Sequence, residues 1–202
     1  MKTVVMTRED AERGAVGHIA ALLRAKPAAV LALAAGRSTR GLYRELSRLC
    51  AAGELSFRQA KIFAVAELLG VADGCSCRAE LERELIANID LAPESFFCPE
   101  ADDCAAYDGL IEAAGGLDLA VLGIGDNGHI GYNEPATPFD SRTHVQKLTD
   151  ATRRQLLKGG EDERAKAEYA VTMGVHTLVE ARQQLLLAFW QENAEPVFKI
   201  VY

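Results

Sequence analysis

Short apolar runs alternate along the chain with longer stretches in which apolar residues recur every three or four positions. Uninterrupted apolar runs are typical of parallel strands that are buried on both faces, and the longer spacing is typical of amphipathic helices. The alternation predicts an α/β fold of three layers, with an open, mostly parallel sheet and helices on both of its faces. The expected strands are residues 29–34, 61–66, 95–98, 117–122, 143–148 and 184–189, and the expected helices are residues 9–23, 40–52, 78–88, 101–114 and about 150–157.

Composition narrows the class of protein. The 202 residues are 49% hydrophobic and 25% charged, which fits a single globular domain over residues 1–202 with a full core. The net charge of -7 and the scarcity of basic clusters argue against nucleic acid as a partner. No apolar run reaches the roughly 18 residues of a membrane helix, and the first residues do not resemble a signal peptide. We therefore expect a cytoplasmic protein without a membrane partner.

The cysteines do not predict a metal site. Their number is five, which is odd, and a reducing compartment keeps such cysteines as thiols. A cluster of Cys75, Cys77, Cys98 and Cys104 is the alternative. Its spacing matches no zinc pattern and no histidine lies near it, so we expect no metal ion.

The most informative segment follows the expected strand 117–122. Residues 122–135 read LGIGDNGHIGYNEP. Open α/β sheets place active sites in loops at the carboxyl ends of their strands, and glycine allows positive φ and the close approach of a ligand. His129 is a side chain that titrates near neutral pH, and Glu134 follows it. A glycine-rich turn with an incidental histidine is the alternative, which the length of the string disfavours.

The first expected strand also ends in a loop that leads directly into a helix. This loop reads AAGRSTR over residues 34–40. The N–H groups at a helix N-terminus attract anions, Ser38 or Thr39 can cap the helix and donate to a phosphate, and Arg37 or Arg40 can add charge-assisted hydrogen bonds. An ordinary helix cap beside two solvated arginines is the alternative.

Residues 122–135 resemble the segment LGIG-x-[DN]-GHI-[GA]-[FY]-NEP of the glucosamine-6-phosphate deaminase (isomerase) family, to which 6-phosphogluconolactonases are related. The ending at residues 133–135 favours the deaminase branch, because the lactonases lack it. Residues 169–175 are similar to a later family segment, A-[IL]-T-[MV]-G, and the similarity covers about residues 20–191. The resemblance implies a Rossmann-like fold, no cofactor, and a hexosamine 6-phosphate whose ring opens, whose C1 and C2 exchange a proton, and which releases ammonia.

The resemblance also implies roles for three residues of the glycine-rich loop. His129 falls at the position of the group that moves a proton at the ring oxygen, and a histidine of tuned pKa suits that task. Glu134 matches the glutamate that orients this histidine. Asn127 matches a position that is Asp in some members and Asn in others.

The phosphate site implied by the resemblance is altered. Gly36 and Ser38 match the family's phosphate loop, T-G-G-[ST]-[PT], whereas Ala35 and Arg37 depart from it, and Thr39 is counted with the loop as an expected phosphate ligand. Lys158 lies nearest to a basic residue that is often Arg, and a Lys there keeps the charge but loses the bidentate fork. The loop and Lys158 together are the expected phosphate-binding residues.

Further departures affect catalysis and binding. Phe63, Glu67 and Gly70 align with a family segment that contains the Asp base, and Ala66 occupies the position of that Asp. A methyl group cannot abstract a proton, and the neighbouring Glu67 is expected to point to the opposite face of the strand. At residues 190 and 193, Trp and Asn replace a Gly and a Lys, and the family's last strand and terminal helix are expected to be missing after residue 202.

Three interpretations stay open at this stage. The chain is a glucosamine-6-phosphate deaminase with impaired turnover, a galactosamine-6-phosphate isomerase, or a non-catalytic relative that binds a sugar phosphate. Residues 26–36 and 115–123 are similar to the galactosamine branch, so the sequence does not separate the two sugar epimers. It also leaves open whether the chain forms a homo-oligomer.

Overall fold

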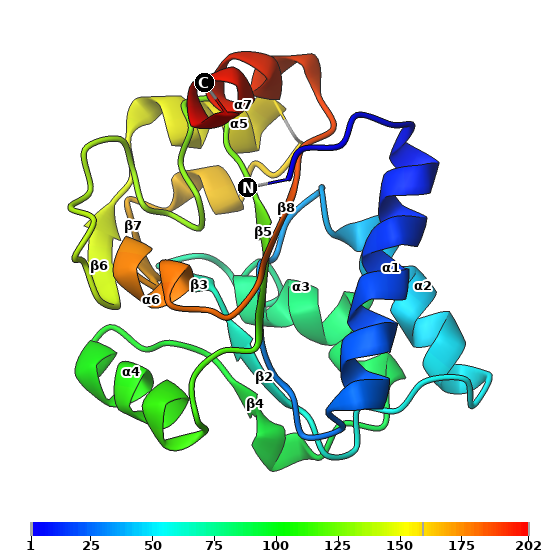
Figure 1. Cartoon of the computed structure of the whole chain (residues 1–202). Helices are drawn as coiled ribbons and strands as arrows, with labels where there is room; N and C mark the ends of the chain where they lie inside the picture. Colours follow the sequence, from blue (N-terminus) through cyan, green and yellow to red (C-terminus); the bar gives the residue numbers. More distant parts are fainter. Residues whose placement is uncertain (1, 159, 202) are drawn as a thin grey trace.

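A five-stranded parallel sheet forms the centre of the molecule in the computed structural model, which describes residues 2–158 and 160–201 (Figure 1). Every neighbouring pair of its strands is parallel. The predicted mostly parallel sheet is therefore confirmed. In spatial order the strands are β4 (Phe96–Phe97), β2 (Lys61–Ala64), β1 (Val30–Leu33), β5 (Leu119–Gly123) and β8 (Gln184–Leu187).

Helices cover both faces of this sheet (Figure 1). Side chains alternate between the faces of a strand, so Leu31 and Leu33 belong to one core cluster, whereas Val30 and Ala32 belong to another. The first cluster includes side chains of α1 (Arg8–Ala25), α2 (Arg40–Ala51) and α3 (Cys77–Glu84). The second includes side chains of α4 (Cys104–Ala113) and α6 (Val175–Val179). The fold thus has three layers, with helices on each face of the sheet and one core cluster between the sheet and each helical layer.

Short polar residues mark the starts of three of these helices. Thr7, Ser76 and Asp103 each accept a hydrogen bond from a backbone N–H three residues later, at the starts of α1, α3 and α4. Short side chains with an acceptor oxygen favour this position. The expected helix 78–88 ends earlier than predicted, because residues 86–88 form a separate 3-10 turn. Further 3-10 turns lie at Pro93–Ser95, Arg164–Lys166 and Gln191–Asn193.

A second, antiparallel sheet lies beside the first and was not predicted. It consists of β3 (Ala66–Leu69), β7 (Tyr169–Thr172) and β6 (His144–Lys147). The prediction of one strand over residues 61–66 is wrong, because the chain bends at Val65 and continues into β3. The backbone oxygen of Val65 accepts a hydrogen bond from Met173, which ties the bend to the second sheet.

The main sheet has a switch point between β1 and β5. The strands β2 and β4 extend the sheet on one side of β1, and β5 and β8 extend it on the other. At such a point the loops after the two central strands diverge and leave a crevice at their carboxyl ends. The loops after β1 and β5 are the two glycine-containing loops singled out from the sequence.

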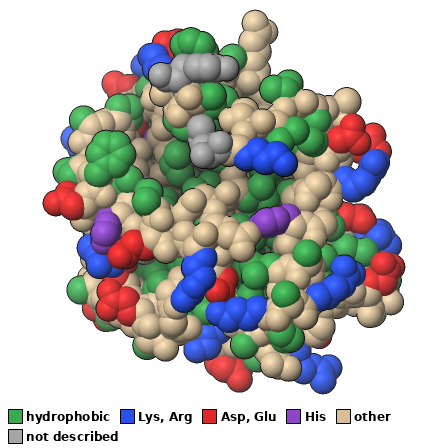
Figure 2. Space-filling model, viewed as in Figure 1, with side chains coloured by type: hydrophobic (Ala, Val, Ile, Leu, Met, Phe, Trp, Pro, Cys, Tyr) green, Lys and Arg blue, Asp and Glu red, His purple; other side chains and the backbone are tan. Residues whose placement is uncertain are grey.

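Two helices lie at this end of the sheet, α5 (Asp150–Lys158) and α7 (Ala194–Val201) (Figure 1). In α7, Pro196 lies close to Gly128 of the β5 loop, 3.8 Å from the position that a Cβ at residue 128 would take. Acidic and basic side chains are interspersed over the face shown in Figure 2. Within the described ranges, no helix has the length and apolar character needed to span a bilayer.

Candidate active site

A cavity of about 110 Å³ opens where the loops after β1 and β5 diverge. Residues 34–38 of the first loop and several residues of the second, from Gly123 to Tyr132, form two of its walls. The other walls come from α5, from the segment that follows α5 and from the turn that precedes α7. Their lining residues are Thr152, Gln155, Leu156, Glu161, Arg164, Trp190 and Asn193. The sequence did not single out the α5 residues, although the spacing of 152, 155 and 156 places them on one helix face.

A chain of hydrogen bonds leads from the cavity wall to a carboxylate. His129 lines the cavity, and its Nδ1 lies 2.8 Å from Asn127 Oδ1. Asn127 Nδ2 donates to Glu134 Oε2 at 2.8 Å. Glu134 Oε1 accepts from the backbone N–H of Thr149 at 2.8 Å. The structure therefore brings the three predicted catalytic residues together, with Asn127 between the other two.

This arrangement selects one tautomer of the imidazole. The oxygen of Asn127 only accepts hydrogen bonds, so Nδ1 of His129 carries the hydrogen and Nε2 is left with a lone pair. Asn127 and Glu134 do not line the cavity. Through these hydrogen bonds they can position the imidazole of His129, whose Nε2 has a lone pair that can accept a proton.

The charges of this site follow from burial and hydrogen bonding. Burial lowers the pKa of His129, and the negative charges of Glu134 and Asp126 oppose that shift only in part. Burial also works against ionisation of Glu134. Hydrogen bonds from Thr152, Thr149 and Asn127 outweigh it and lower the pKa of this carboxyl. At neutral pH the site thus holds a neutral imidazole and a carboxylate.

The buried neutral imidazole makes stability depend on pH. Because the pKa of His129 is lower in the folded protein, the unfolded chain binds more protons just below its own histidine pKa of about 6.5. The folded protein is therefore most stable, as far as His129 is concerned, above that pH, and its free energy of unfolding decreases as the pH falls toward the folded pKa. Urea unfolding between pH 5 and pH 8 is expected to show this loss, and His129→Gln is expected to flatten it. An unchanged slope in the variant would assign the pH dependence to other groups.

Gly125 leaves the space that the His129 ring occupies. A Cβ at residue 125 would lie 2.3 Å from Cε1 of the imidazole and 2.6 Å from its Nε2. The ring would have to move, and a displacement of about 1 Å can cost a catalytic group about a hundredfold in rate. Gly125→Ala is expected to lower turnover by that order with little change in ligand affinity. Gly109→Ala, where the added Cβ meets no atom within 4 Å, is the control and is expected to behave as wild type in a steady-state assay.

The loop after β1 presents only part of its predicted phosphate site to the cavity. Gly36, Arg37 and Ser38 line the cavity, and the φ of 148° at Gly36 is a conformation that favours glycine. Thr39 is buried, and its hydroxyl donates to the backbone oxygens of Ala34 and Gly36. It makes no side-chain cap at α2, so the expected capping by Thr39 is wrong.

The opposite wall carries Trp190, whose ring centre lies 4.7 Å from the guanidinium of Arg37. Ligand pockets are commonly about 300–1,000 Å³, and the present cavity of about 110 Å³ is smaller. Asn193 is buried and donates from Nδ2 to the backbone oxygen of Ile124 at 3.0 Å. It therefore fastens the turn that carries Trp190 to the loop after β5.

The structure also places the residues expected to affect proton transfer. Ala66 is buried and pairs with Thr172, whose hydroxyl accepts from the backbone N–H of Tyr132 in the cavity wall. The carboxylate of Glu67 accepts from the backbone N–H groups of Cys77 and Arg78 at the start of α3. Glu67 is thus engaged at a helix N-terminus and is not among the residues that line the cavity.

Lys158, the last predicted phosphate ligand, is an exposed residue at the end of α5 and does not line the described cavity. Instead, Arg164 and Glu161 line it. These two residues lie in a polar segment without periodicity, and no sequence pattern indicated their place.

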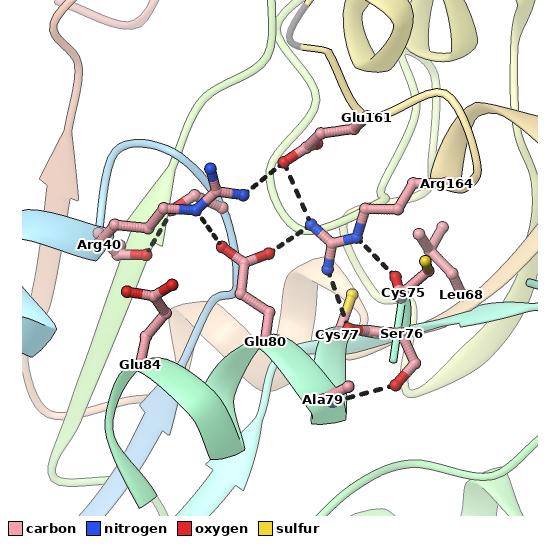
Figure 3. A network of polar contacts seen from close by, with 12 residues as sticks. Arg40, Leu68, Cys75, Ser76, Cys77, Ala79, Glu80, Glu84, Glu161 and Arg164 are labelled. Atoms are coloured by element: carbon pink, nitrogen blue, oxygen red, sulfur yellow. Dashed lines mark hydrogen bonds and ion pairs between the residues drawn. The ribbon is translucent and has the colours of Figure 1, made fainter. Parts of the chain in front are cut away.

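Arg164 and Glu161 belong to a network of ion pairs (Figure 3). Glu80 is buried on α3 and accepts from Arg40 Nε at 2.7 Å and from Arg164 Nη1. Arg40 Nη2 also lies 2.6 Å from Glu161 Oε1. Burial works against ionisation of Glu80, but Arg40 and Arg164 outweigh it and lower the pKa of this carboxyl.

Within the described ranges, no group of His, Cys, Asp and Glu side chains is arranged to hold a metal ion. The cysteines at residues 50, 75, 77, 98 and 104 are free thiols. Burial raises the pKa of Cys77 and of Cys98 to about 12. Neither thiol is therefore a nucleophile at neutral pH.

Comparisons with known sequences agree on one family. The family described as "Glucosamine-6-phosphate isomerases/6-phosphogluconolactonase" matches residues 6–202. A glucosamine-6-phosphate deaminase of Lysinibacillus sphaericus is 38% identical over 186 residues, which cover 88% of this chain and 78% of that protein. Another, of Mycolicibacterium smegmatis, is 40% identical over 197 residues, which cover 93% of this chain and 75% of that protein.

Solved structures show the same fold. A monomeric glucosamine-6-phosphate deaminase has a TM-score of 0.93 at 35% identity, and the match covers 100% of this chain and 87% of that chain. A 6-phosphogluconolactonase of Thermotoga maritima has a TM-score of 0.72 at 17% identity, covering 96% and 85%. The second likeness is one of fold alone. The Rossmann-like architecture expected from the sequence is confirmed by the first.

Proposed function

Because the chain belongs to the family of glucosamine-6-phosphate isomerases and 6-phosphogluconolactonases, we propose that it acts in amino-sugar phosphate metabolism on a hexosamine 6-phosphate. The observation that carries the proposal is the shared cavity. Residues 36–38 at the start of α2 and His129 of the β5 loop line the same space. An anion site at a helix N-terminus and a neutral histidine supported by a carboxylate are thus within reach of one small ligand.

The first step that these groups support is opening of the sugar ring. Nε2 of His129 accepts the proton of the C1 hydroxyl and returns it to the ring oxygen, as the C–O bond of the ring breaks and the aldehyde forms. General acid–base catalysis of this kind contributes about 10²–10⁴-fold to rate. Glu134, through Asn127, stabilises the imidazolium that forms in between.

The second step, transfer of a proton from C2 to C1 with later loss of ammonia, is proposed to be slow. It needs a base beside C1 and C2, and residue 66 is alanine. Glu67 cannot replace it while its carboxylate holds the N-terminus of α3. The chain is therefore proposed to be a glucosamine-6-phosphate deaminase/isomerase with impaired turnover, and the galactosamine epimer stays an alternative substrate.

Ala66 also favours a second candidate, a protein that binds the sugar phosphate without converting it. Two measurements on the purified chain separate the candidates. Ammonia release from glucosamine 6-phosphate measures turnover, and a thermal shift with the same compound at millimolar concentration measures binding. We expect stabilisation together with slow ammonia release. Stabilisation without any release would support the binding protein, and a folded protein that is not stabilised would contradict both candidates.

A further inference from the structure

Two arginines from different parts of the chain, Arg40 and Arg164, lie side by side in this network (Figure 3). Arg40 is the first residue of α2, two positions after Ser38 of the cavity wall, and reaches the cavity through its contact with Glu161 and not as a lining residue. Arg164 lies in the 3-10 turn Arg164–Lys166 and itself lines the cavity. Each donates to a different oxygen of Glu80. Glu80 thereby fixes the two guanidinium groups side by side.

A second carboxylate bridges the same arginines from the side of the cavity. One oxygen of Glu161, Oε1, lies 2.6 Å from Arg40 Nη2 and 3.5 Å from Arg164 Nη1. Glu161 also lines the cavity. Whereas Glu80 is buried in a helix, Glu161 follows Gly160 in a turn whose φ at Gly160 is 72°. Of the two carboxylates, Glu161 lines the cavity and Glu80 does not, so Glu161 is the one that a ligand in the cavity meets.

The charges of the group balance only while Glu161 is in place. Two arginines face two carboxylates, so withdrawal of Glu161 leaves one positive charge in excess beside the cavity. Guanidinium groups bind phosphate oxygens with the same geometry as carboxylate oxygens. A phosphate monoester can therefore take the place of the Glu161 carboxylate without leaving either arginine unpaired.

We propose that Arg40 and Arg164, held by Glu80, form an anion subsite for a phosphate monoester, and that Glu161 occupies this subsite when the cavity is empty. The inference rests on the proposed function only for the identity of the phosphate compound. The subsite would supply the positive charge that the resemblance led us to expect from residues 158 and 193. Lys158 is exposed outside the cavity lining, and residue 193 is an asparagine that binds the oxygen of Ile124.

The test compares the affinity for inorganic phosphate, measured by calorimetry, in wild type and two variants. Glu161→Gln removes the competing charge and is expected to bind phosphate about tenfold more tightly, the effect of one charge-assisted hydrogen bond. Glu163→Gln is the matched control. It lies two residues away, is half-exposed and pairs with Lys166 on the surface, so its affinity should equal that of wild type.

Equal or weaker phosphate binding by Glu161→Gln would overturn the proposal, because Glu161 would then support the arginines without competing with a ligand. Glu161→Asp is a second variant that keeps the charge on a side chain one methylene shorter. Its affinity for phosphate is expected to lie between those of wild type and Glu161→Gln. Phosphate should also raise the melting temperature of Glu161→Gln more than that of wild type. A protein that releases no ammonia from glucosamine 6-phosphate but shows these gains would contradict the proposed turnover and leave the subsite standing.

Discussion

Ala66→Asp is expected to raise the rate of ammonia release from glucosamine 6-phosphate, by up to about 10²–10⁴-fold, the contribution typical of a general base. Residue 66 begins β3 and pairs with Thr172, which holds the backbone of Tyr132 in the cavity wall. The resemblance places the family's base at this position, which Thr172 links to the wall of the cavity that His129 lines. The measurement is steady-state ammonia release by the purified variant at saturating substrate.

The control for this variant is Ala66→Asn, which adds a side chain of the same size without a basic oxygen. We expect it to remain as slow as wild type. If the Ala66→Asn variant were as active as the Ala66→Asp variant, the gain would come from packing and the missing base would lie elsewhere. Normal turnover of the wild-type chain would show that another residue already acts as the base at C2.

Glu80→Gln is expected to destabilise the fold by about 3–5 kcal/mol, the usual cost of removing one partner of a buried ion pair. The Glu80 side chain is 3% exposed, and that of Arg164 is 8% exposed. An amide retains one acceptor oxygen for two guanidinium groups, so one of them loses a bond while it stays buried. For a chain of this size, each kcal/mol lowers the melting temperature by about 2–4 °C, which predicts a fall of roughly 6–20 °C.

Glu82→Gln on the same helix is the matched control. Glu82 is 48% exposed and lies 3.8 Å from Arg78, and an exposed pair of this kind contributes at most about 1 kcal/mol. Urea unfolding of both variants measures the difference. Equal stability of Glu80→Gln and Glu82→Gln would mean that the cost of burying the network cancels its attraction, so that the network positions Arg40 and Arg164 without stabilising the fold.

Much of the fold could be predicted from the sequence because the strands of a parallel sheet carry their signal locally. The buried run Val30–Leu33 and the run that ends in Gly123 are apolar on both faces, and that pattern requires no knowledge of their neighbours. The loop around His129 was recognisable for a similar reason. Its glycines and polar residues are close together in the sequence, so their spacing already indicates a backbone that leaves room for a ring and a ligand.

The sequence by itself therefore determined the layers of the fold, the positions of the main strands along the chain and the place of His129. Only the tertiary structure decided the rest, because it depends on residues far apart in the chain. The bend at Val65 follows from pairing with β7, about a hundred residues later, whereas the apolar pattern of residues 61–66 runs on without a break. Glu80 and Arg164 meet across 84 positions. The partners of polar side chains outside a periodic element cannot be predicted from their spacing in the sequence. The grouping of Arg40 and Arg164 with Glu80 and Glu161 was therefore known only from the folded structure.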